Sequence, residues 1–268
     1  MNEIKKPWIG SFNPFRIFGN LYFAGTVPAS VHIIDTGAGL IMLDAAYDES
    51  HEEITNNIRQ LGFDPHDIKY IMLTHGHIDH LGGAKSMKLL SGAKICLGEP
   101  DREYANGRLD LSYAKELGMA FSKTFEPDIL LHDGDTIELG STKITAVATP
   151  GHTPGAMSYF FDVTDGISTF RAALHGGMGI NTLCKEFLDK YNLPYSLRDS
   201  FVSSMHRLNE EHVDIFLGNH MQHNHTEERA KLIESGNTLA FVNPDEWQQY
   251  NLWCIGNLKN MIHKEKEG

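Results

Sequence analysis

Three histidines and one aspartate lie within a six-residue stretch of the chain. The stretch directly follows an apolar run, residues 70–73, which predicts a buried strand. With the threonine that precedes it, it reads Thr74-His75-Gly76-His77-Ile78-Asp79-His80. Imidazole nitrogens and carboxylate oxygens are donors that suit zinc. Because the chain turns as it leaves the strand, His75 and His77 can face one side and Asp79 and His80 the other. The pattern therefore predicts two metal ions held close together.

Two later histidines stand in the same context, at the end of an apolar run. His152 follows residues 143–148 and has Gly151 and Gly155 beside it, which let the backbone approach a metal closely. His220 follows the apolar run that begins at Val213. The repetition of one context favours metal ligation over a chance excess of histidine.

Other polar residues at strand ends leave alternatives open. Asp44 ends the apolar run 40–43, where a carboxylate needs partners, so it is either a turn former or an anchor that orients the histidines. His175 is either an extra metal ligand or an ordinary strand-end residue. His223 and His225 are expected in a surface loop near His220.

The elements that must position these residues alternate between strands and helices along one uninterrupted chain. No repeat or linker divides the 268 residues, so we expect a single domain over residues 1–268. Residues 99–123 are irregular and could cover a cleft. Asp133-Gly134-Asp135 predicts a turn between short strands. The alternating charges of residues 264–267 predict a solvated tail.

Composition excludes several classes of partner. The formal net charge is −12 and no Lys/Arg cluster interrupts it, so neither nucleic acid nor an anionic membrane is expected to bind. No apolar run is long enough to span a membrane. Residues 1–8 contain no apolar leader, and the three cysteines are far apart in the sequence. These features predict a cytoplasmic protein with a small-molecule substrate.

The motifs also resemble those of a known family. His75-Gly76-His77-Ile78-Asp79-His80 fits the HxHxDH signature of the metallo-β-lactamase superfamily. The resemblance runs from about Pro14 to the helix after His220, and is closest to the third subclass of metallo-β-lactamases (subclass B3-like), which uses no cysteine ligand. Its further motifs are Pro14-Phe15-Arg16-Ile17-Phe18-Gly19-Asn20-Leu21-Tyr22, Gly39-Leu40-Ile41-Met42-Leu43-Asp44, Gly151-His152-Thr153-Pro154-Gly155 and Asp214-Ile215-Phe216-Leu217-Gly218-Asn219-His220. This resemblance implies an α/β fold, the four-layer αβ/βα sandwich.

The resemblance also implies a ligand set for two zinc ions per chain. One zinc would be held by His75, His77 and His152, and the other by Asp79, His80 and His220. Glyoxalase II and lactonase relatives place a metal-bridging aspartate near Gly176-Gly177, where this chain has no carboxylate. Asn181 lies in a stretch that resembles the lining of the substrate cleft.

The implied activity is that of a dizinc metallohydrolase whose metal-bound hydroxide opens an amide or ester ring, as in a β-lactamase. Asp79 would be catalytic, because it could hold the water and relay its proton. The alternative is a lactone, thioester or other ester hydrolase of the same superfamily, since a fold does not fix a substrate. A redox or metal-binding module of the flavodiiron type would need more carboxylate ligands and a fused flavin domain.

Overall fold

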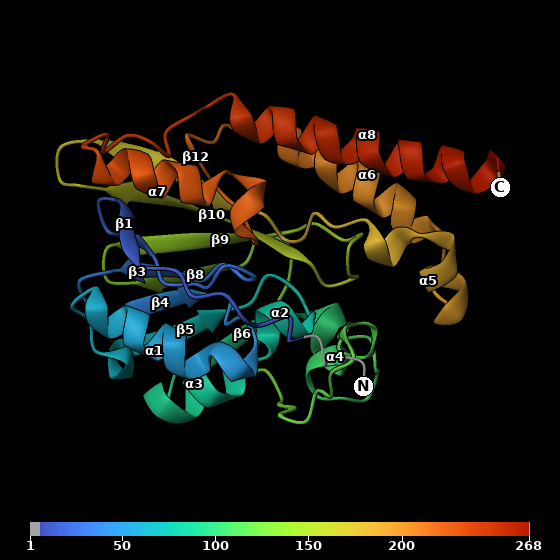
Figure 1. The fold of residues 1–268 in the computed structure, drawn as a ribbon, viewed down its shortest axis with the longest axis horizontal. Helices are drawn as coiled ribbons and strands as arrows, with labels where there is room; N and C mark the ends of the chain where they lie inside the picture. Colours follow the sequence, from blue (N-terminus) through green and yellow to red (C-terminus); the bar gives the residue numbers. More distant parts are fainter. Residues whose placement is uncertain (1–5, 268) are drawn as a thin grey trace.

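Two β-sheets pack face to face, and helices cover both outer surfaces (Figure 1). The computed structural model describes residues 6–267. Apolar side chains fill the three spaces between the four layers. The four-layer αβ/βα sandwich predicted from the motifs is therefore confirmed.

The first sheet has seven strands, which neighbour one another in chain order. They are β1 (Phe15–Phe18), β2 (Leu21–Phe23), β3 (His32–Asp35), β4 (Leu40–Leu43), β5 (Ile68–Met72), β6 (Lys94–Gly98) and β7 (Ile129–Leu131). The first four strands pair antiparallel, whereas β4 to β7 are parallel. The carboxyl ends of β4, β5 and β6 therefore lie at one edge of the sheet.

The second sheet has five strands in the order β12-β11-β10-β9-β8. They are β8 (Thr136–Leu139), β9 (Thr142–Ala148), β10 (Met157–Thr164), β11 (Thr169–Leu174) and β12 (Ile215–Leu217). The pairing of β9 and of β11 with β10 is antiparallel, and β11 and β12 are parallel. The carboxyl ends of β9, β11 and β12 consequently share one edge too.

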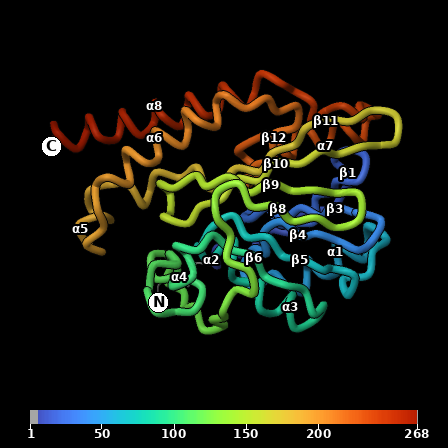
Figure 2. The backbone as a smooth tube through the Cα atoms, turned by 180° about the vertical axis from the view of Figure 1, so that it is seen from behind, coloured from blue at the N-terminus to red at the C-terminus, as the bar shows by residue number. Residues whose placement is uncertain are grey.

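Helices follow the strands on the outside of each sheet. The α-helices are α1 (His51–Gln60), α2 (Ile78–Leu81), α3 (Ala84–Ser91), α4 (Arg102–Ala105), α5 (Lys185–Lys190), α6 (Ser196–Asn209), α7 (Thr226–Glu234) and α8 (Glu246–Glu267). Short 3-10 helices are η1 (Asp48–Ser50), η2 (Pro65–Asp67), η3 (Glu99–Asp101), η4 (Lys115–Leu117), η5 (Asn181–Leu183) and η6 (Met221–His223). Figure 2 shows α6 and α8 lying side by side above the second sheet and extending beyond it.

Apolar periodicity explains which face each helix buries. Ile54 and Ile58 of α1 and Met87 of α3 pack on the first sheet in one cluster. Phe201 and Met205 of α6, with residues of α8, pack on the second sheet in another. α6 also reaches the loop that carries His152, because Ser204 donates a 2.8 Å hydrogen bond to the Pro150 carbonyl.

The predicted Asp133-Gly134-Asp135 turn between short strands is observed between β7 and β8. It does not close a hairpin, because β7 belongs to the first sheet and β8 to the second. The chain crosses between the layers at this turn. Residues 264–267, expected to form a solvated tail, are the last turn of α8. Lys264, Lys266 and Glu267 are exposed as expected, whereas Glu265 accepts a 2.7 Å hydrogen bond from Arg198.

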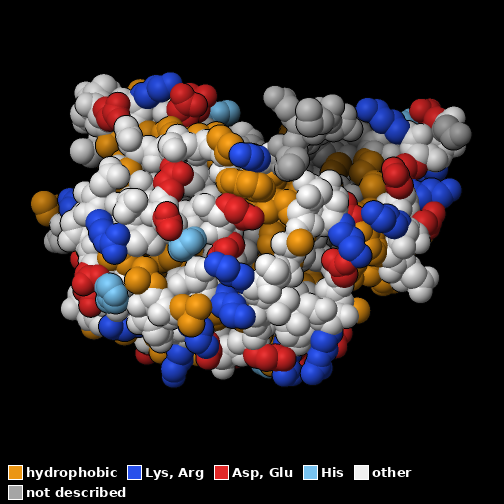
Figure 3. Space-filling model, turned by 60° about the horizontal axis from the view of Figure 1, so that its bottom comes forward, with side chains coloured by type: hydrophobic (Ala, Val, Ile, Leu, Met, Phe, Trp, Pro, Cys, Tyr) orange, Lys and Arg blue, Asp and Glu red, His pale blue; other side chains and the backbone are white. Residues whose placement is uncertain are grey.

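The structure bears on the predictions about membrane spans, surface charge and cysteines. Among residues 6–267 no helix is both long and apolar enough to cross a membrane. The prediction that residues 1–8 contain no apolar leader falls partly on residues 1–5, which lie outside the described residues. On the face drawn in Figure 3, acidic and basic side chains are interspersed rather than gathered by sign. Cys96, Cys184 and Cys254 are all free thiols.

Candidate metal centre

The polar residues singled out in the sequence meet where the carboxyl ends of strands from both sheets face each other. Asp44 follows β4, and the stretch from His75 to His80 follows β5. From the second sheet, His152 follows β9 and His220 follows β12. Ligands bind at the carboxyl ends of parallel strands in many α/β proteins, because the loops there are free to carry polar groups.

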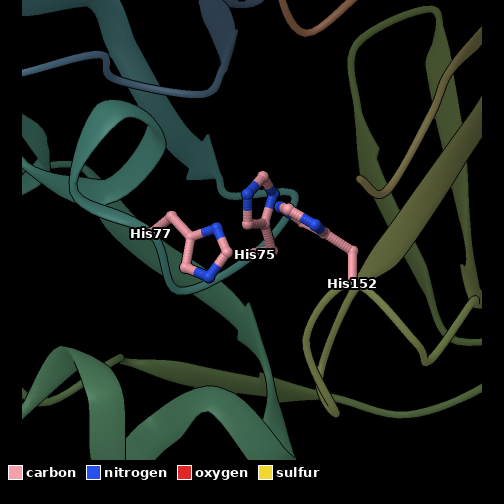
Figure 4. A group of neighbouring side chains, drawn as sticks. All are labelled: His75, His77 and His152. Carbon is pink, nitrogen blue, oxygen red and sulfur yellow. The ribbon is translucent and has the colours of Figure 1, made fainter. Parts of the chain in front are cut away.

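His75, His77 and His152 form one compact group. Their potential ligand atoms all lie within 4.8 Å of one another, and all three side chains are buried. The ring centroids of His77 and His152 are 4.5 Å apart. Figure 4 shows the three rings converging from two loops: His75 and His77 come from the loop after β5 of the first sheet, and His152 comes from the loop after β9 of the second. Three imidazole nitrogens at this spacing can hold one metal ion.

A second group adjoins the first. Ligand atoms of Asp79, His80 and His75 also lie within 4.8 Å of one another. The Asp79 Oδ2 atom is 3.4 Å from His80 Nε2 and 3.5 Å from His220 Nε2. The structure therefore brings together all six residues predicted as ligands, with His75 at the junction of the two groups.

Hydrogen bonds fix the orientation of four of the five rings. The Nδ1 atom of His75 is 3.0 Å from Thr74 Oγ1, and that of His80 is 2.9 Å from Asp44 Oδ2. The Nδ1 atoms of His152 and His220 each lie 2.7 Å from a backbone carbonyl, those of Gly179 and Pro28. Because a carbonyl or carboxylate oxygen accepts, the Nδ1 atoms of His80, His152 and His220 donate, which leaves Nε2 as the ring atom that can bind a metal.

Asp44 anchors the histidine stretch to the neighbouring strand. It is 1% exposed and accepts hydrogen bonds from the Thr74 backbone N–H at 2.7 Å and from Thr74 Oγ1 at 2.8 Å, in addition to its bond with His80. Its backbone is left-handed, with φ 57°. Of the two alternatives, the anchor is the one that these contacts describe, since the carboxylate orients one of the histidines directly.

Asp101 is a second buried anchor, which the sequence did not reveal. Its carboxylate accepts hydrogen bonds from Gly76 N at 2.7 Å, Gly155 N at 2.7 Å and Thr153 Oγ1 at 2.6 Å. It thereby ties the loop of His75 and His77 to the loop of His152. In the sequence it is one more acidic residue in an irregular segment, and no spacing distinguishes it.

Two glycines are required by the crowding around His152. A Cβ atom on Gly177 would lie 2.6 Å from the His152 ring, and one on Gly151 would lie 2.5 Å from Phe201. Both residues have positive φ, 145° and 148° respectively. The absence of a carboxylate at Gly176-Gly177 thus has a steric basis, because His152 occupies the space that a side chain at Gly177 would need.

Burial and mutual repulsion keep most of these imidazoles neutral. Burial lowers the pKa of His75 and of His77 well below the ordinary value, and nearby histidines lower both further. Burial also lowers the pKa of His152, to about 4, and that of His220. Neutral imidazole is the form that binds metal.

Asp79 and His80 form a charged pair in the metal-free chain. Burial opposes both charges, but His80 lowers the pKa of Asp79, and Asp79 with Asp44 raises the pKa of His80 to about 10. A cation that took the place of the His80 proton would meet the same two carboxylates. The pair therefore marks a position where positive charge is stabilised.

A cleft of about 230 Å³ opens onto the six residues. Asn181 lines it, as the resemblance implied, and so do Tyr47, Tyr113 and Asn219, which the sequence did not single out. The other lining residues are His75, His77, Asp79, His80, Leu117, His152, Gly177, Met178, Gly179, His220 and His223. A larger cavity of about 720 Å³ lies by α1 and α7, but its lining offers glutamates without histidine or cysteine and so no comparable chemistry.

The three other histidines singled out in the sequence differ in their position relative to the cleft. His175 is fully buried and absent from the cleft lining, because its ring packs against Trp247 at 5.5 Å and its Nδ1 accepts a bond from Gly177 N. His223 lines the cleft, 5.0 Å from the His220 ring, although it was expected in a surface loop. His225 is exposed, as expected.

Comparison with known proteins decides the family. The family model described as the metallo-beta-lactamase superfamily matches residues 24–169, more than half of the chain. This chain belongs to that superfamily. As in the members it resembles, a metal-dependent hydrolase is the activity that the family and the histidine-rich site support.

Solved structures of metallo-β-lactamases superpose on nearly the whole chain. BJP-1, a subclass B3 enzyme of Bradyrhizobium japonicum, is 29% identical, with a TM-score of 0.87 and 98% of each chain covered. Native FEZ-1 from Legionella gormanii is also 29% identical, with a TM-score of 0.88 over 97% of this chain and 98% of that one. The predicted resemblance to the third subclass is confirmed.

A hydrolase named for a different substrate also matches in sequence. The hydroxyacylglutathione hydrolase of Pseudomonas putida (strain GB-1) is 33% identical over 92 residues, which are 34% of this chain and 27% of that enzyme. The match thus spans about a quarter of that enzyme's length. The superfamily member described here therefore shares sequence with hydrolases of more than one substrate class.

Proposed function

We propose that residues 1–268 form one domain that acts as a dizinc metallohydrolase and opens a cyclic amide or ester, in the manner of a β-lactamase. The observation that carries the proposal is the convergence of five imidazoles and one carboxylate, three of whose rings donate Nδ1–H to an oxygen and so present Nε2 as the metal-binding atom. In this proposal His75, His77 and His152 hold one zinc, and Asp79, His80 and His220 hold the other. The donor set fits zinc, since it consists of imidazoles and a carboxylate with fixed orientation.

When bound, the two zinc ions would supply a water acidified to near-neutral pKa and an electrophile for the carbonyl oxygen of the substrate. The chain's own residues would do the rest. Nearby histidines lower the pKa of Asp79 and keep its carboxylate ionised, so its oxygens can accept a hydrogen bond from the attacking water and hold that water in position. Asp79 is therefore the proposed catalytic residue.

Neutral polar groups on the cleft wall would orient the substrate. Asn181 lies at the start of η5 and is exposed to the cleft, so its amide can donate a hydrogen bond to a substrate oxygen. Asn219 is more tightly held, because its Nδ2 donates to the His175 carbonyl at 2.8 Å. We propose Asn181 as the substrate-binding residue and Asn219 as part of the wall.

A second function on the same scaffold is hydrolysis of a lactone, thioester or other ester. The sequence match to a hydroxyacylglutathione hydrolase supports this reading. The crowded Gly177, where no bridging carboxylate can stand, favours the β-lactamase-like reading over it. Both share one reaction type, the addition of water to an acyl carbon.

A panel of substrates on zinc-loaded protein tests the proposal. It contains a penicillin, a cephalosporin, a carbapenem, an acyl-homoserine lactone and a glutathione thioester. Ring opening of at least one β-lactam, lost after metal removal and restored by zinc, is the expected result. Turnover of the lactone or thioester alone would replace the first function by the second.

The predicted cytoplasmic location is a separate proposal, which cell fractionation tests.

A further inference from the structure

The larger cavity lies apart from the histidine cleft, at the edge of the sandwich. Its volume is about 720 Å³, and its walls come from η1, α1, α7 and residues 11–15, which lead into β1. Figures 1 and 2 both show α1 and α7 on the same side of the molecule, below and above β1. None of the six proposed metal ligands lines this cavity. Its volume falls in the range of ligand pockets, about 300–1,000 Å³.

Negative charge dominates the wall of this cavity. Five glutamates line it: Glu49, Glu52, Glu53, Glu227 and Glu234. The lysine in the wall, Lys231, pairs with Glu227 at 2.7 Å. The other four glutamates have no salt-bridge partner among the residues that the structure describes. Because like charges around a concave surface raise the local concentration of counter-ions, the cavity attracts cations.

The carboxylates of this wall are spread over η1 and two helices rather than gathered at one point. Within residues 6–267, three or more potential metal-ligand side chains come within 4.8 Å of one another only at the histidine site. A bare ion such as Ca²⁺ takes about six to eight oxygen ligands around one point. The spread of the glutamates therefore suits a ligand whose positive charges are themselves separated.

A buried amide in the wall offers a further acceptor. Asn57 is 4% exposed and lines the cavity. Its Nδ2 donates to the carbonyls of Ala24 at 3.1 Å and Gly25 at 3.2 Å, which fixes the orientation of the amide. No described residue donates to its Oδ1. Since an acceptor in a buried side chain needs a donor, Asn57 Oδ1 is a place for an N–H group of a ligand.

Two phenylalanines give the cavity an apolar surface beside the carboxylates. Phe12 and Phe15 both line it, with ring centroids 6.3 Å apart. The Phe15 ring also stacks on Phe23 at 5.5 Å, which holds it in position. Methylene groups pack against aromatic rings, and the faces of these rings attract ammonium groups. The cavity thus combines apolar surface with carboxylates and an amide oxygen.

We propose that this cavity binds a linear aliphatic polyamine, a ligand class outside the hydrolytic chemistry of the histidine site. The ammonium groups of the ligand pair with glutamates of α1 and α7, and its methylene segments cover Phe12 and Phe15. One of its N–H groups donates to Asn57 Oδ1. A protonated polyamine carries donors only, which suits a wall rich in acceptors, whereas a peptide also brings carbonyls that need donors.

Calorimetric titration of the zinc-loaded full chain with spermine, a tetraamine, tests the proposal. We expect saturable binding of one spermine per chain and weaker binding of 1,4-diaminobutane, which has fewer charges. Both affinities should fall as the salt concentration rises, because salt screens the carboxylates. At equal ionic strength, Mg²⁺ should compete with spermine no better than Na⁺ does.

Matched charge variants distinguish the cavity from the general acidity of the surface. Glu53→Gln combined with Glu234→Gln removes one charge from each helix, and should weaken spermine binding roughly tenfold through the loss of two partly screened ion pairs. Glu103→Gln combined with Glu210→Gln removes the same charge from exposed positions that do not line the cavity, and should leave the affinity unchanged. Both double variants retain all six proposed metal ligands, so spermine bound to zinc would be affected by neither.

Several outcomes would overturn the proposal. These are the absence of saturable spermine binding, an unchanged affinity in Glu53→Gln/Glu234→Gln, and an equal loss in the two double variants. Displacement of spermine by Mg²⁺ at equal ionic strength would reduce the cavity to an acidic surface without preference for a polyamine. Tighter binding of a tetralysine peptide than of spermine would make a protein segment the occupant instead. Turnover plays no part in this experiment, so its result is independent of the proposed function.

Discussion

The Asp44 carboxylate lies 2.9 Å from His80 Nδ1, and both side chains are 1% exposed. The same carboxylate accepts two hydrogen bonds from Thr74, so one buried group fixes both the start of the histidine stretch and a ring near its end. A histidine whose Nδ1–H is bonded to a carboxylate presents a more basic Nε2 to a metal. The arrangement links the strand order of the first sheet directly to the geometry of the second group of ligands.

Asp44→Asn should weaken binding of the zinc assigned to Asp79, His80 and His220. If the amide nitrogen takes the place of Oδ1, the Thr74 N–H loses its acceptor; if it takes the place of Oδ2, both the His80 ring and the Thr74 hydroxyl lose theirs. We expect a loss of affinity of roughly 10–100-fold, measured by competition with a chromophoric chelator. Asparagine tolerates the left-handed backbone at this position, so the fold should persist. Equal zinc affinity in the Asp44→Asn variant and the wild type would show that His80 needs no such anchor.

Asp101→Ala should destabilise the fold and loosen the two histidine loops together. Three buried donors would lose their acceptor, so we expect the free energy of unfolding to fall by roughly 3 kcal/mol or more in urea titrations of metal-free protein. Asp133→Ala is the control, because that carboxylate is half-exposed in its pair with Arg207 and its loss should cost about 1 kcal/mol or less. Similar losses in the two variants would contradict the role given to Asp101.

The metal-free chain should lose stability as the pH falls from about 6.5 to about 4. Burial lowers the pKa of His32 to about 4 and that of His175 to about 3, so between these values and the unfolded pKa the unfolded chain binds more protons. Asp101 acts in the opposite direction, because burial raises its pKa to about 6. His80 contributes little in this window, since it is protonated in both states below about 6.5.

A variant isolates the histidine contribution to this pH dependence. His32→Leu removes one titrating group from the core, so its unfolding free energy should fall less steeply with acidification than that of the wild type. Urea titrations at several pH values between about 6.5 and about 4 measure the two slopes. Identical slopes would mean that His32 titrates in the folded protein as it does in the unfolded chain.

Asp79→Asn should lower turnover of any substrate found in the panel by roughly a hundredfold, comparable to the ~3 kcal/mol associated with removing one catalytic polar group. The amide carries no charge, so it is a weaker hydrogen-bond acceptor for the attacking water than the carboxylate. Zinc content must be measured beside the rate, because Asp79 is also a proposed ligand. A fully loaded variant with an unchanged rate would remove Asp79 from the mechanism.

Most of the fold was predictable because its signals are local. An apolar run predicted the strand before the histidines, and the observed strand β5 ends one residue earlier than expected. Turn residues predicted where the chain bends, but not which sheet the next strand joins. At Gly134 the chain crosses from β7 in the first sheet to β8 in the second. The last turn of α8 was missed because Arg198, distant in sequence, stabilises it through Glu265.

The residues of the site also fall into those that the sequence predicted and those that it did not. Histidines at strand ends could be found from spacing, and the structure brings the predicted residues together. Asp101 and Tyr113 could not, since their positions in the site arise from contacts between segments that are remote in sequence. His223 was expected in a surface loop, yet η6 turns it into the cleft wall.

Zinc stoichiometry tests the central claim most directly. The full chain is stripped with a chelator, reconstituted with zinc, freed of excess metal and measured by elemental analysis. The account predicts two zinc ions per chain, with His152→Ala and His220→Ala each retaining about one, because each variant removes a ligand from a different group. A reconstituted wild type with only a trace of zinc would contradict the assignment of all six ligands.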